Sequence, residues 1–258
     1  MKNEGLVVLE RALGVLHFVA TRTDASLAEI SKGMNLGKST VARLITCLEA
    51  AGLLARQPEA QRFYVGPRVL EYSFAARRGS SLIAAAHPHM VSLESEVGET
   101  VGLHVRVGDR RLCVHEVESH NPLRYVHGVG RPGPLNAGAI GKVILAFQPL
   151  DDQKAVLGRL QGLPVDSLVA SGGRELEAEL AAIKQRGYGL SRGEIVSGAI
   201  SLAAPVFDRS GKLAGALSIT GLDARIPEER VSSIATNLCD SARTISHSLG
   251  HGSIDLTS

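Results

Sequence analysis

Four residues of the segment KSTVAR, namely Lys38, Ser39, Thr40 and Arg43, carry groups that proteins use to contact DNA. Lysine and arginine pair with phosphate oxygens, arginine also reads base edges, and serine or threonine can donate to either. In a helix, Lys38, Ser39 and Arg43 lie on one polar face, whereas Thr40 points partly into the domain. We expect this face to contact the major groove; the alternative is the solvated face of an ordinary helical hairpin.

Two further arginines flank the tip of a predicted β-hairpin directly after this helix. The stretch GLLARQPEAQRFYVG has apolar, strand-forming ends and a turn signal at Pro58 to Ala60. Arg56 and Arg62 stand on either side of that turn. A hairpin after a DNA-contacting helix is the wing of a winged helix, so we expect both arginines to meet phosphates.

The elements that must position these residues are two short helices joined by a tight turn. Ser26 followed three residues later by Glu29 predicts a capping box at the start of the first helix. Asn35 suits a turn position with positive φ, and Gly52 suits the end of the second helix. A third amphipathic helix is expected from Gly5 to Thr21.

Charge and composition agree with a nucleic-acid contact in the first part of the chain. Residues 1–68 hold nine Lys and Arg against six Asp and Glu, whereas the net charge of all 258 residues is only +2. Aromatic residues make up 3% of the chain and Trp is absent, which argues against single-strand binders that stack bases on aromatic side chains. The sequence therefore favours double-stranded DNA.

The cysteines and the apolar runs indicate where the protein works. Cys47, Cys113 and Cys239 are far apart and odd in number, so they predict neither a disulfide framework nor a zinc site. No apolar run is long enough to span a bilayer, and the N-terminus does not read as a signal peptide. We expect a cytoplasmic protein without membrane contact.

The remainder of the chain is expected to form a second, α+β domain. Residues 67–80 read as a linker helix, after which the pattern predicts strands at 100–108, 111–118 and 123–130. A helix from Ala139 to Phe147 and two apolar strands, Ile200 to Phe207 and Leu213 to Thr220, follow. The predicted divisions are a winged helix-turn-helix at 1–66, the linker at 67–80, the α+β domain at 81–250 and a flexible tail at 251–258.

The chain resembles the IclR family of bacterial transcription regulators over nearly its whole length. The resemblance rests on four segments in this order: GKSTVARLITCLEAAGLLAR, RFYVGPRVLEY, RPGPLNAGAIGKVILA and GYGLSRGEIVSGAISLAAPVFDRSGKLAGALSITGL. It implies an N-terminal winged helix, a linker helix that helps dimerise, and a GAF-like domain with an antiparallel sheet flanked by helices. It also implies homodimers, often homotetramers, on pseudo-palindromic operators.

The effector site implied by the resemblance lies where the Ala139 helix begins. A helix N-terminus offers unpaired N–H groups to an anion, so Ala139 and Ile140 are expected to donate to a small carboxylate. Residues matched to the family pocket complete the expected site, with hydroxyls from the two strands and a wall residue: Tyr125, Asn136, Ser201, Ser218 and Thr220. Many relatives carry His where Asn136 stands. For Glu194 we expect a structural hydrogen bond, and contact with the ligand is the alternative.

An enzyme or a metal sensor that uses the second domain is the alternative hypothesis. The segment NAGAIGK resembles a phosphate-binding loop but lacks the glycine and hydroxyl positions of that motif, and no nucleophile elbow is present. His104 and His115 could meet across a hairpin near Cys113, but no helical His pair completes a metal site. We therefore expect no enzyme activity, no metal and no cofactor, and predict a DNA-binding regulator whose operator affinity responds to a small organic acid.

Overall fold

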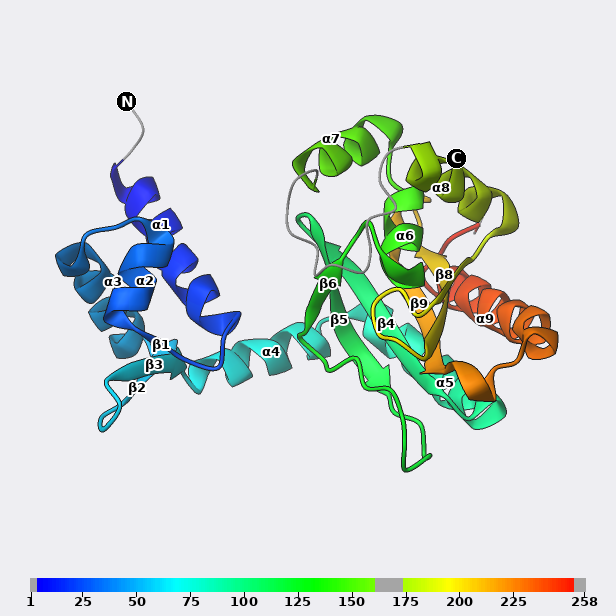
Figure 1. The fold of residues 1–258 in the computed structure, drawn as a ribbon, viewed down its shortest axis with the longest axis horizontal. Helices are drawn as coiled ribbons and strands as arrows, with labels where there is room; N and C mark the ends of the chain where they lie inside the picture. Colours follow the sequence, from blue (N-terminus) through cyan, green and yellow to red (C-terminus); the bar gives the residue numbers. More distant parts are fainter. Residues whose placement is uncertain (1–3, 161–173, 253–258) are drawn as a thin grey trace. The chain divides into compact units, whose positions relative to one another are not determined.

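The computed structural model describes residues 4–160 and 174–252, which form two compact units, Met1–Ser80 and Ser81–Ser258. Figure 1 shows the helices and strands of both units. The smaller unit contains, in chain order, α1 (Glu4–Ala20), β1 (Ala25–Ser26), α2 (Leu27–Met34), α3 (Lys38–Ala50), β2 (Leu54–Gln57), β3 (Arg62–Val65) and α4 (Arg68–Arg78). These are the elements of a winged helix-turn-helix, with α4 following the wing.

The α2–α3 pair forms as the sequence predicts. The Ser26 side chain accepts from the backbone N–H of Glu29, and the Glu29 carboxylate accepts from the backbone N–H of Ser26, which completes the capping box. Asn35 ends α2 in the left-handed region with φ 51°. The apolar face of α3 is buried against α1 and α2 through Val41, Leu44, Ile45 and Leu48. The opposite face of α3 is consequently left toward solvent.

The wing is a small three-stranded sheet rather than a lone hairpin. Strand β3 pairs antiparallel with β2 and with the two-residue strand β1, in the order β1-β3-β2. Phe63 on β3 and Leu54 on β2 are buried in the core of the smaller unit. This third strand ties the wing to the residues immediately before α2.

The larger unit is built around a six-stranded antiparallel sheet of order β6-β5-β4-β9-β8-β7. Its elements are α5 (Ser81–Val97), β4 (Thr100–Val107), β5 (Arg110–Val117), β6 (Pro132–Pro134), α6 (Gly138–Ala146), α7 (Leu150–Leu160), α8 (Arg174–Arg186), β7 (Gly189–Arg192), β8 (Ala199–Phe207), β9 (Leu213–Leu222), the 3₁₀ turn η1 (Asp223–Arg225) and α9 (Glu228–Ser248). The α+β class and the flanked antiparallel sheet are therefore as predicted.

The two faces of this sheet carry different helices because side chains alternate along each strand. Leu217 and Ile219 of β9 pack against α5 and α9, whereas Ala216 packs against α6. Helix α6 is buried along its whole length, including Lys142, whose side chain is 1% exposed. The sheet face under α6 is thus the face on which polar residues of β4, β5, β8 and β9 become enclosed.

The segment from Leu123 to Gly130 is not the strand that its sequence pattern predicts. Its backbone runs as an irregular loop, and the edge strand β6 instead begins at Pro132, where a loop was expected. The backbone groups of the loop are bonded by side chains: Thr100 Oγ1 donates to the carbonyl of Tyr125, and Glu116 accepts from the N–H of His127. These tertiary contacts override the strand propensity of the segment.

At the end of the described chain, the His251 ring packs against Phe207, with the ring centroids 5.3 Å apart. Most of the tail predicted at 251–258 lies outside the described residues. Among residues 4–160 and 174–252, no helix combines the length and the apolar character needed to cross a membrane.

Candidate functional site

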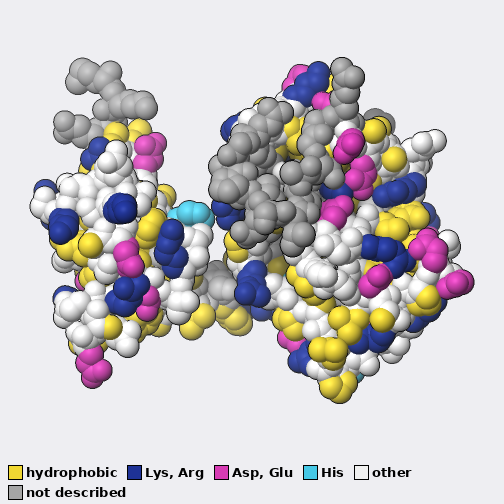
Figure 2. All heavy atoms as spheres, viewed as in Figure 1, with side chains coloured by type: hydrophobic (Ala, Val, Ile, Leu, Met, Phe, Trp, Pro, Cys, Tyr) yellow, Lys and Arg dark blue, Asp and Glu magenta, His cyan; other side chains and the backbone are white. Residues whose placement is uncertain are grey.

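The polar face of α3 is accessible and begins at an uncapped helix terminus. Lys38, Ser39 and Arg43 are exposed, whereas Thr40 is half-buried, in line with its predicted direction. The N-cap residue Gly37 makes no side-chain cap hydrogen bond, and the first turn of α3 has no acidic residue. Figure 2 shows Lys and Arg side chains among acidic ones on the visible face of the smaller unit. A helix start of this kind favours an anion such as a phosphate.

The two wing arginines differ in how their charges are used. Arg56 is exposed, and its guanidinium donates to the side-chain oxygen of Gln61 at the tip of the wing. Arg62 instead pairs with Asp24 at 2.6 Å and with Glu29 at 3.0 Å, and the Asp24 hydrogen bond raises the pKa of Arg62. Arg62 therefore fastens the wing to the start of α2, and its contact with phosphate stays a prediction.

The larger unit contains a cavity at the start of α6. Its volume is about 30 Å³, counted as the space open to the centre of a water molecule, and by this measure one water needs about 10–15 Å³. Five of the seven residues predicted to contact an effector line this cavity: Tyr125, Ala139, Ile140, Ser201 and Thr220. The cavity in this state has room for a molecule of a few heavy atoms.

The first amides of α6 are already bonded to side chains from the segment around β7. Gly138 N donates to Glu194 Oε2 at 2.6 Å, and Ala139 N donates to Ser191 Oγ at 3.1 Å. Glu194 also pairs with the buried Nζ of Lys142. Glu194 thus has the structural hydrogen-bonding role expected for it, whereas the predicted donor Ala139 has its N–H engaged by a protein hydroxyl.

Gly138 gives this helix start its geometry. Its φ is +69°, a region that side chains with a Cβ rarely adopt. A Cβ at this position would also lie 3.0 Å from Cγ1 of Ile195, which lines the cavity. A larger residue at this position would push against the cavity wall.

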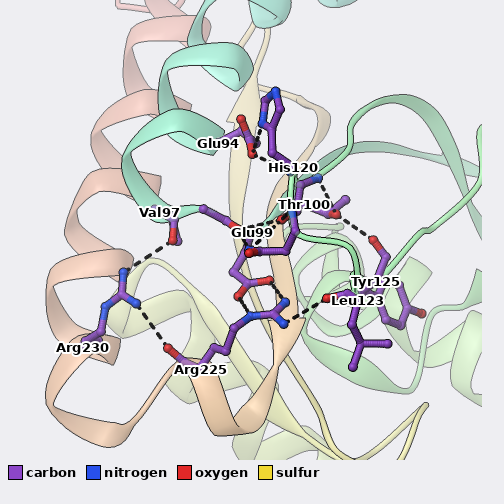
Figure 3. Close-up of polar contacts among 12 residues, drawn as sticks. Glu94, Val97, Glu99, Thr100, His120, Leu123, Tyr125, Arg225 and Arg230 are labelled. Atoms are coloured by element: carbon purple, nitrogen blue, oxygen red, sulfur yellow. Dashed lines mark hydrogen bonds and ion pairs between the residues drawn. The ribbon is translucent and has the colours of Figure 1, made fainter.

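The wall that carries Tyr125 is held by a group of polar contacts, shown in Figure 3. Thr100 Oγ1 donates to the Tyr125 carbonyl at 2.6 Å. Arg225 donates to the Leu123 carbonyl at 2.9 Å while its guanidinium pairs with the buried carboxylate of Glu99. The loop backbone is thereby fixed to β4 and η1, which positions the Tyr125 ring at the cavity.

The two strand hydroxyls at the cavity bond to one another. Ser201 Oγ and Thr220 Oγ1 lie 2.8 Å apart across the β8–β9 ladder. Ser218 shares the face of Thr220 but does not line the cavity; it is fully buried, with its Oγ 3.2 Å from His104 Nε2 and donating to the Gly102 carbonyl. Asn136 is half-buried and is not part of the lining either.

Three buried basic side chains stand beside the cavity, and the sequence did not single them out as ligand contacts. Arg111 and His127 line it, and His104 lies behind them with its Nδ1 3.3 Å from Arg111 Nη1. The rings of His104 and His127 meet edge to face, 4.7 Å apart. Gly102 makes room for this packing, because a Cβ there would lie 2.6 Å from His104 Nε2.

Burial sets the charge states of this cluster. It lowers the pKa of His127 to about 3, helped by the positive charge of Arg111. Burial also lowers the pKa of His104 well below 6.5, with His127 and Arg111 adding to the effect, and it lowers the pKa of Arg111. Both imidazoles are therefore neutral near neutral pH, while the arginine keeps its charge.

The structure places the histidines that the sequence groups together on different parts of the larger unit. His104 faces the cavity side of the sheet, whereas Nε2 of His115 lies 2.9 Å from Nδ1 of His87 on α5. Burial raises the pKa of the nearby Cys113 thiol to about 12, which favours the protonated thiol. Within the described part of the chain, no three His, Cys, Asp or Glu side chains are grouped so that they could hold a metal ion.

Comparisons with known proteins match both units. Residues 8–58 match the family model described as the IclR helix-turn-helix domain, and residues 75–247 match the one described as bacterial transcriptional regulator IclR C-terminal. The HTH-type transcriptional regulator BhcR of Paracoccus denitrificans is 30% identical over 94% of this chain and 87% of its own. KdgR of Dickeya chrysanthemi is 28% identical over 93% of this chain and 79% of its own.

Solved structures agree with these matches. The Thermotoga maritima IclR structure is 28% identical, with a TM-score of 0.68 over 95% of this chain and 100% of that one. An IclR transcriptional regulator from Alicyclobacillus acidocaldarius shares the fold with a TM-score of 0.80 at 23% identity, over 94% of this chain and 98% of that one.

Proposed function

This chain belongs to the IclR family of bacterial transcriptional regulators and is a DNA-binding regulator, and on that premise we propose that a small carboxylate in the larger unit modulates its operator binding. The observation that carries the proposal is the cavity at the start of α6. A regulator of this kind needs one surface for DNA and one site whose occupancy changes that surface.

For the DNA surface, we assign the major-groove contacts to α3. Lys38 and Ser39 lie at its exposed N-terminus, where phosphate is favoured, and Arg43 lies one turn further on the same face. Arg56 on the wing supplies a phosphate contact. Thr40 is half-buried, and it contributes only through the edge of its side chain.

For the effector, we assign the contacts to the five predicted residues that line the cavity. The Ser201 and Thr220 hydroxyls and the Tyr125 ring can meet polar and flat parts of a small acid, and Ile140 can donate from the first turn of α6. Ala139 can donate to an effector only if its N–H leaves Ser191. Ser218 serves the packing behind the cavity.

We further propose that two copies of the chain bind a pseudo-palindromic operator, and that pairs of dimers form tetramers. Apolar side chains of α1 are exposed along one face, with Leu6 at 58%, Leu9 at 56% and Leu13 at 53%. On α4, Leu70 is 73% and Phe74 is 63% exposed. Exposed apolar rows of this kind are typical of surfaces covered by a partner, and a second copy supplies the two-fold symmetry of the operator.

Fluorescence anisotropy with DNA from upstream of the protein's own gene tests the function. We expect tight binding that weakens steeply with salt, and one member of a panel of carboxylates that changes the affinity. Binding that responds to no carboxylate would refute the effector assignment and leave the DNA assignment in place. Absence of sequence preference on this DNA and on a randomised pool would refute operator recognition itself.

A further inference from the structure

One buried cation of the cavity has no carboxylate partner among the described residues. This cation is Arg111, which is 8% exposed and on which no carboxylate acts. Its Nη1 donates to His104, but its buried Nε has no hydrogen-bond partner in the described chain. A buried guanidinium left in this way is strongly unfavourable, so the arrangement is explained if the group has a partner that is not part of the chain.

A second buried group beside Arg111 is also unsatisfied. His127 is 7% exposed, and neither of its ring nitrogens has a hydrogen-bond partner among the described residues. Its ring is fixed between His104 and Tyr125, with centroids 4.7 and 4.9 Å away. Its backbone N–H donates to the Glu116 carboxylate, so the ring is held in place rather than free to turn outward.

The start of α6, in contrast, already has its negative partner. Glu194 accepts from Gly138 N and pairs with Lys142, and Ser191 accepts from Ala139 N. An anion bound there would displace Ser191 and come close to the Glu194 carboxylate. Among the described residues, the positive charge at the cavity that lacks a carboxylate partner is therefore on Arg111, and the buried side-chain nitrogens without a hydrogen-bond partner are on Arg111 and His127.

We propose that Arg111 and His127 anchor the carboxylate of the effector and so form the charged end of its site. This proposal rests on the proposed function. The guanidinium donates from Nε and from a terminal nitrogen to the two carboxylate oxygens, and a ring nitrogen of His127 donates to one of them. The remainder of the small acid then points toward Ser201 and Thr220. Acids are recognised at this end, and their neutral amides are not.

His104 is a positioning residue in this arrangement. Because Arg111 Nη1 is the donor to His104 Nδ1, the His104 proton resides on Nε2 and is donated to Ser218, which donates to the Gly102 carbonyl. This chain of donors ends on the sheet backbone. It fixes the plane of the guanidinium, so that Nε faces a constant direction.

The test uses formate, the smallest carboxylate, with formamide as its neutral counterpart of equal size. Thermal unfolding of the full-length protein is followed as formate replaces chloride at constant sodium concentration, since a ligand that binds only the folded state raises the melting temperature with its concentration. The variants are Arg111→Met, His127→Gln and the control Arg110→Met. Arg110 is the exposed arginine that precedes Arg111 on β5.

We expect formate, but not formamide, to stabilise wild type and Arg110→Met. The Arg111→Met change should lower the affinity for formate by ~30-fold or more, because one partner of a buried charge pair is lost. The His127→Gln change should lower this affinity by ~3- to 10-fold, because one neutral hydrogen bond is lost. The His127→Gln variant carries the test if Arg111→Met does not fold. No stabilisation of wild type, equal stabilisation by formamide, or an undiminished response in both variants would overturn the anchor.

Operator binding separates this inference from the function on which it rests. If a carboxylate changes operator affinity equally in wild type and in Arg111→Met, the effector function stands and the anchor is wrong. If formate binding depends on Arg111 but no carboxylate changes operator affinity, the anchor stands and the effector function fails.

Discussion

Replacing His127 with glutamine should make the larger unit less sensitive to acid. The buried ring of His127 stays neutral in the folded protein because burial lowers its pKa from 6.5 to about 3. The unfolded chain exposes the ring, which then takes up a proton near 6.5. Between these two values the unfolded state binds more protons, so stability falls as the pH falls below 6.5.

The magnitude follows from the interval between the two pKa values. At about pH 5 the ring is still neutral in the folded protein but protonated in the unfolded chain. The difference builds up over the ~1.5 pH units between ~6.5 and ~5. At ~1.36 kcal/mol per pH unit, the unfolding free energy falls by ~2 kcal/mol. The titratable groups that face His127 are His104, Arg111 and Tyr125, and the Glu116 carboxylate accepts from its backbone N–H. His104 adds its own acid sensitivity, which remains in the variant.

Urea unfolding at about pH 7.5 and about pH 5, read out by hydrogen exchange of peptides from β4 and β9, reports on the larger unit alone. Wild type should lose ~2 kcal/mol more of its unfolding free energy than His127→Gln over this interval. His247→Gln, which removes an exposed histidine of α9, is the control and should behave as wild type. Equal losses in wild type and His127→Gln, within ~0.5 kcal/mol, would refute the assignment of a neutral, desolvated ring.

Three further predictions concern other parts of the molecule. Arg43→Ala should weaken operator binding by ~1–3 kcal/mol in anisotropy if Arg43 reads a base, and unchanged binding would show that α3 presents another face to DNA. Arg62→Ala should speed hydrogen exchange in the wing, because its pairs with Asp24 and Glu29 are lost, and should lower the salt slope of DNA binding by ~1 if Arg62 also contacts a phosphate. Glu194→Gln should destabilise the larger unit by ~2 kcal/mol in urea unfolding, because the carboxylate that accepts from Gly138 N and pairs with buried Lys142 is lost, while Glu179 still pairs with Lys142. Replacing the exposed Glu177 with glutamine is the control, and equal effects of the two changes would contradict the role of Glu194.

Local features of the fold were predictable because their causes lie within a few residues. The capping box of Ser26 and Glu29, the left-handed Asn35 and the buried stripe of α3 all depend on spacings of up to one or two helical turns. The wing was predictable in the same way from its turn signal. The third strand of the wing was not, because Ala25 pairs with Phe63 across the intervening helices.

The candidate site was predictable only in part, because its charged end depends on long-range register. Ser201 and Thr220 could be placed together from a hairpin pattern. Arg111 and His127 lie in two segments that the sequence predicts as strands, and nothing local indicates that the two residues become buried at one cavity. The loop that carries His127 was itself predicted wrongly, because its backbone partners are side chains such as Thr100 and Glu116.

The ion pairs of Arg62 and Lys142 also depend on partners that lie far away in the sequence. The basic character of Arg62 predicts a DNA contact, but it does not reveal the pair with Asp24, which lies 38 residues earlier in the chain. Lys142 lies in an apolar helix, and its carboxylate partners Glu179 and Glu194 come 37 and 52 residues later. Partners at such separations are set by tertiary packing, which a single sequence does not reveal.

The way in which the cavity loop is fastened has a consequence for how this scaffold can diversify. Thr100, Glu116 and Arg225 all bond to backbone atoms of the loop, whose residues Tyr125 and His127 line the cavity. Substitutions in the loop can therefore change the side chains offered to a ligand while the loop keeps its path. Selection for a new chemical signal can act on this wall of the cavity while the strands of the sheet and the DNA-binding unit stay unaltered.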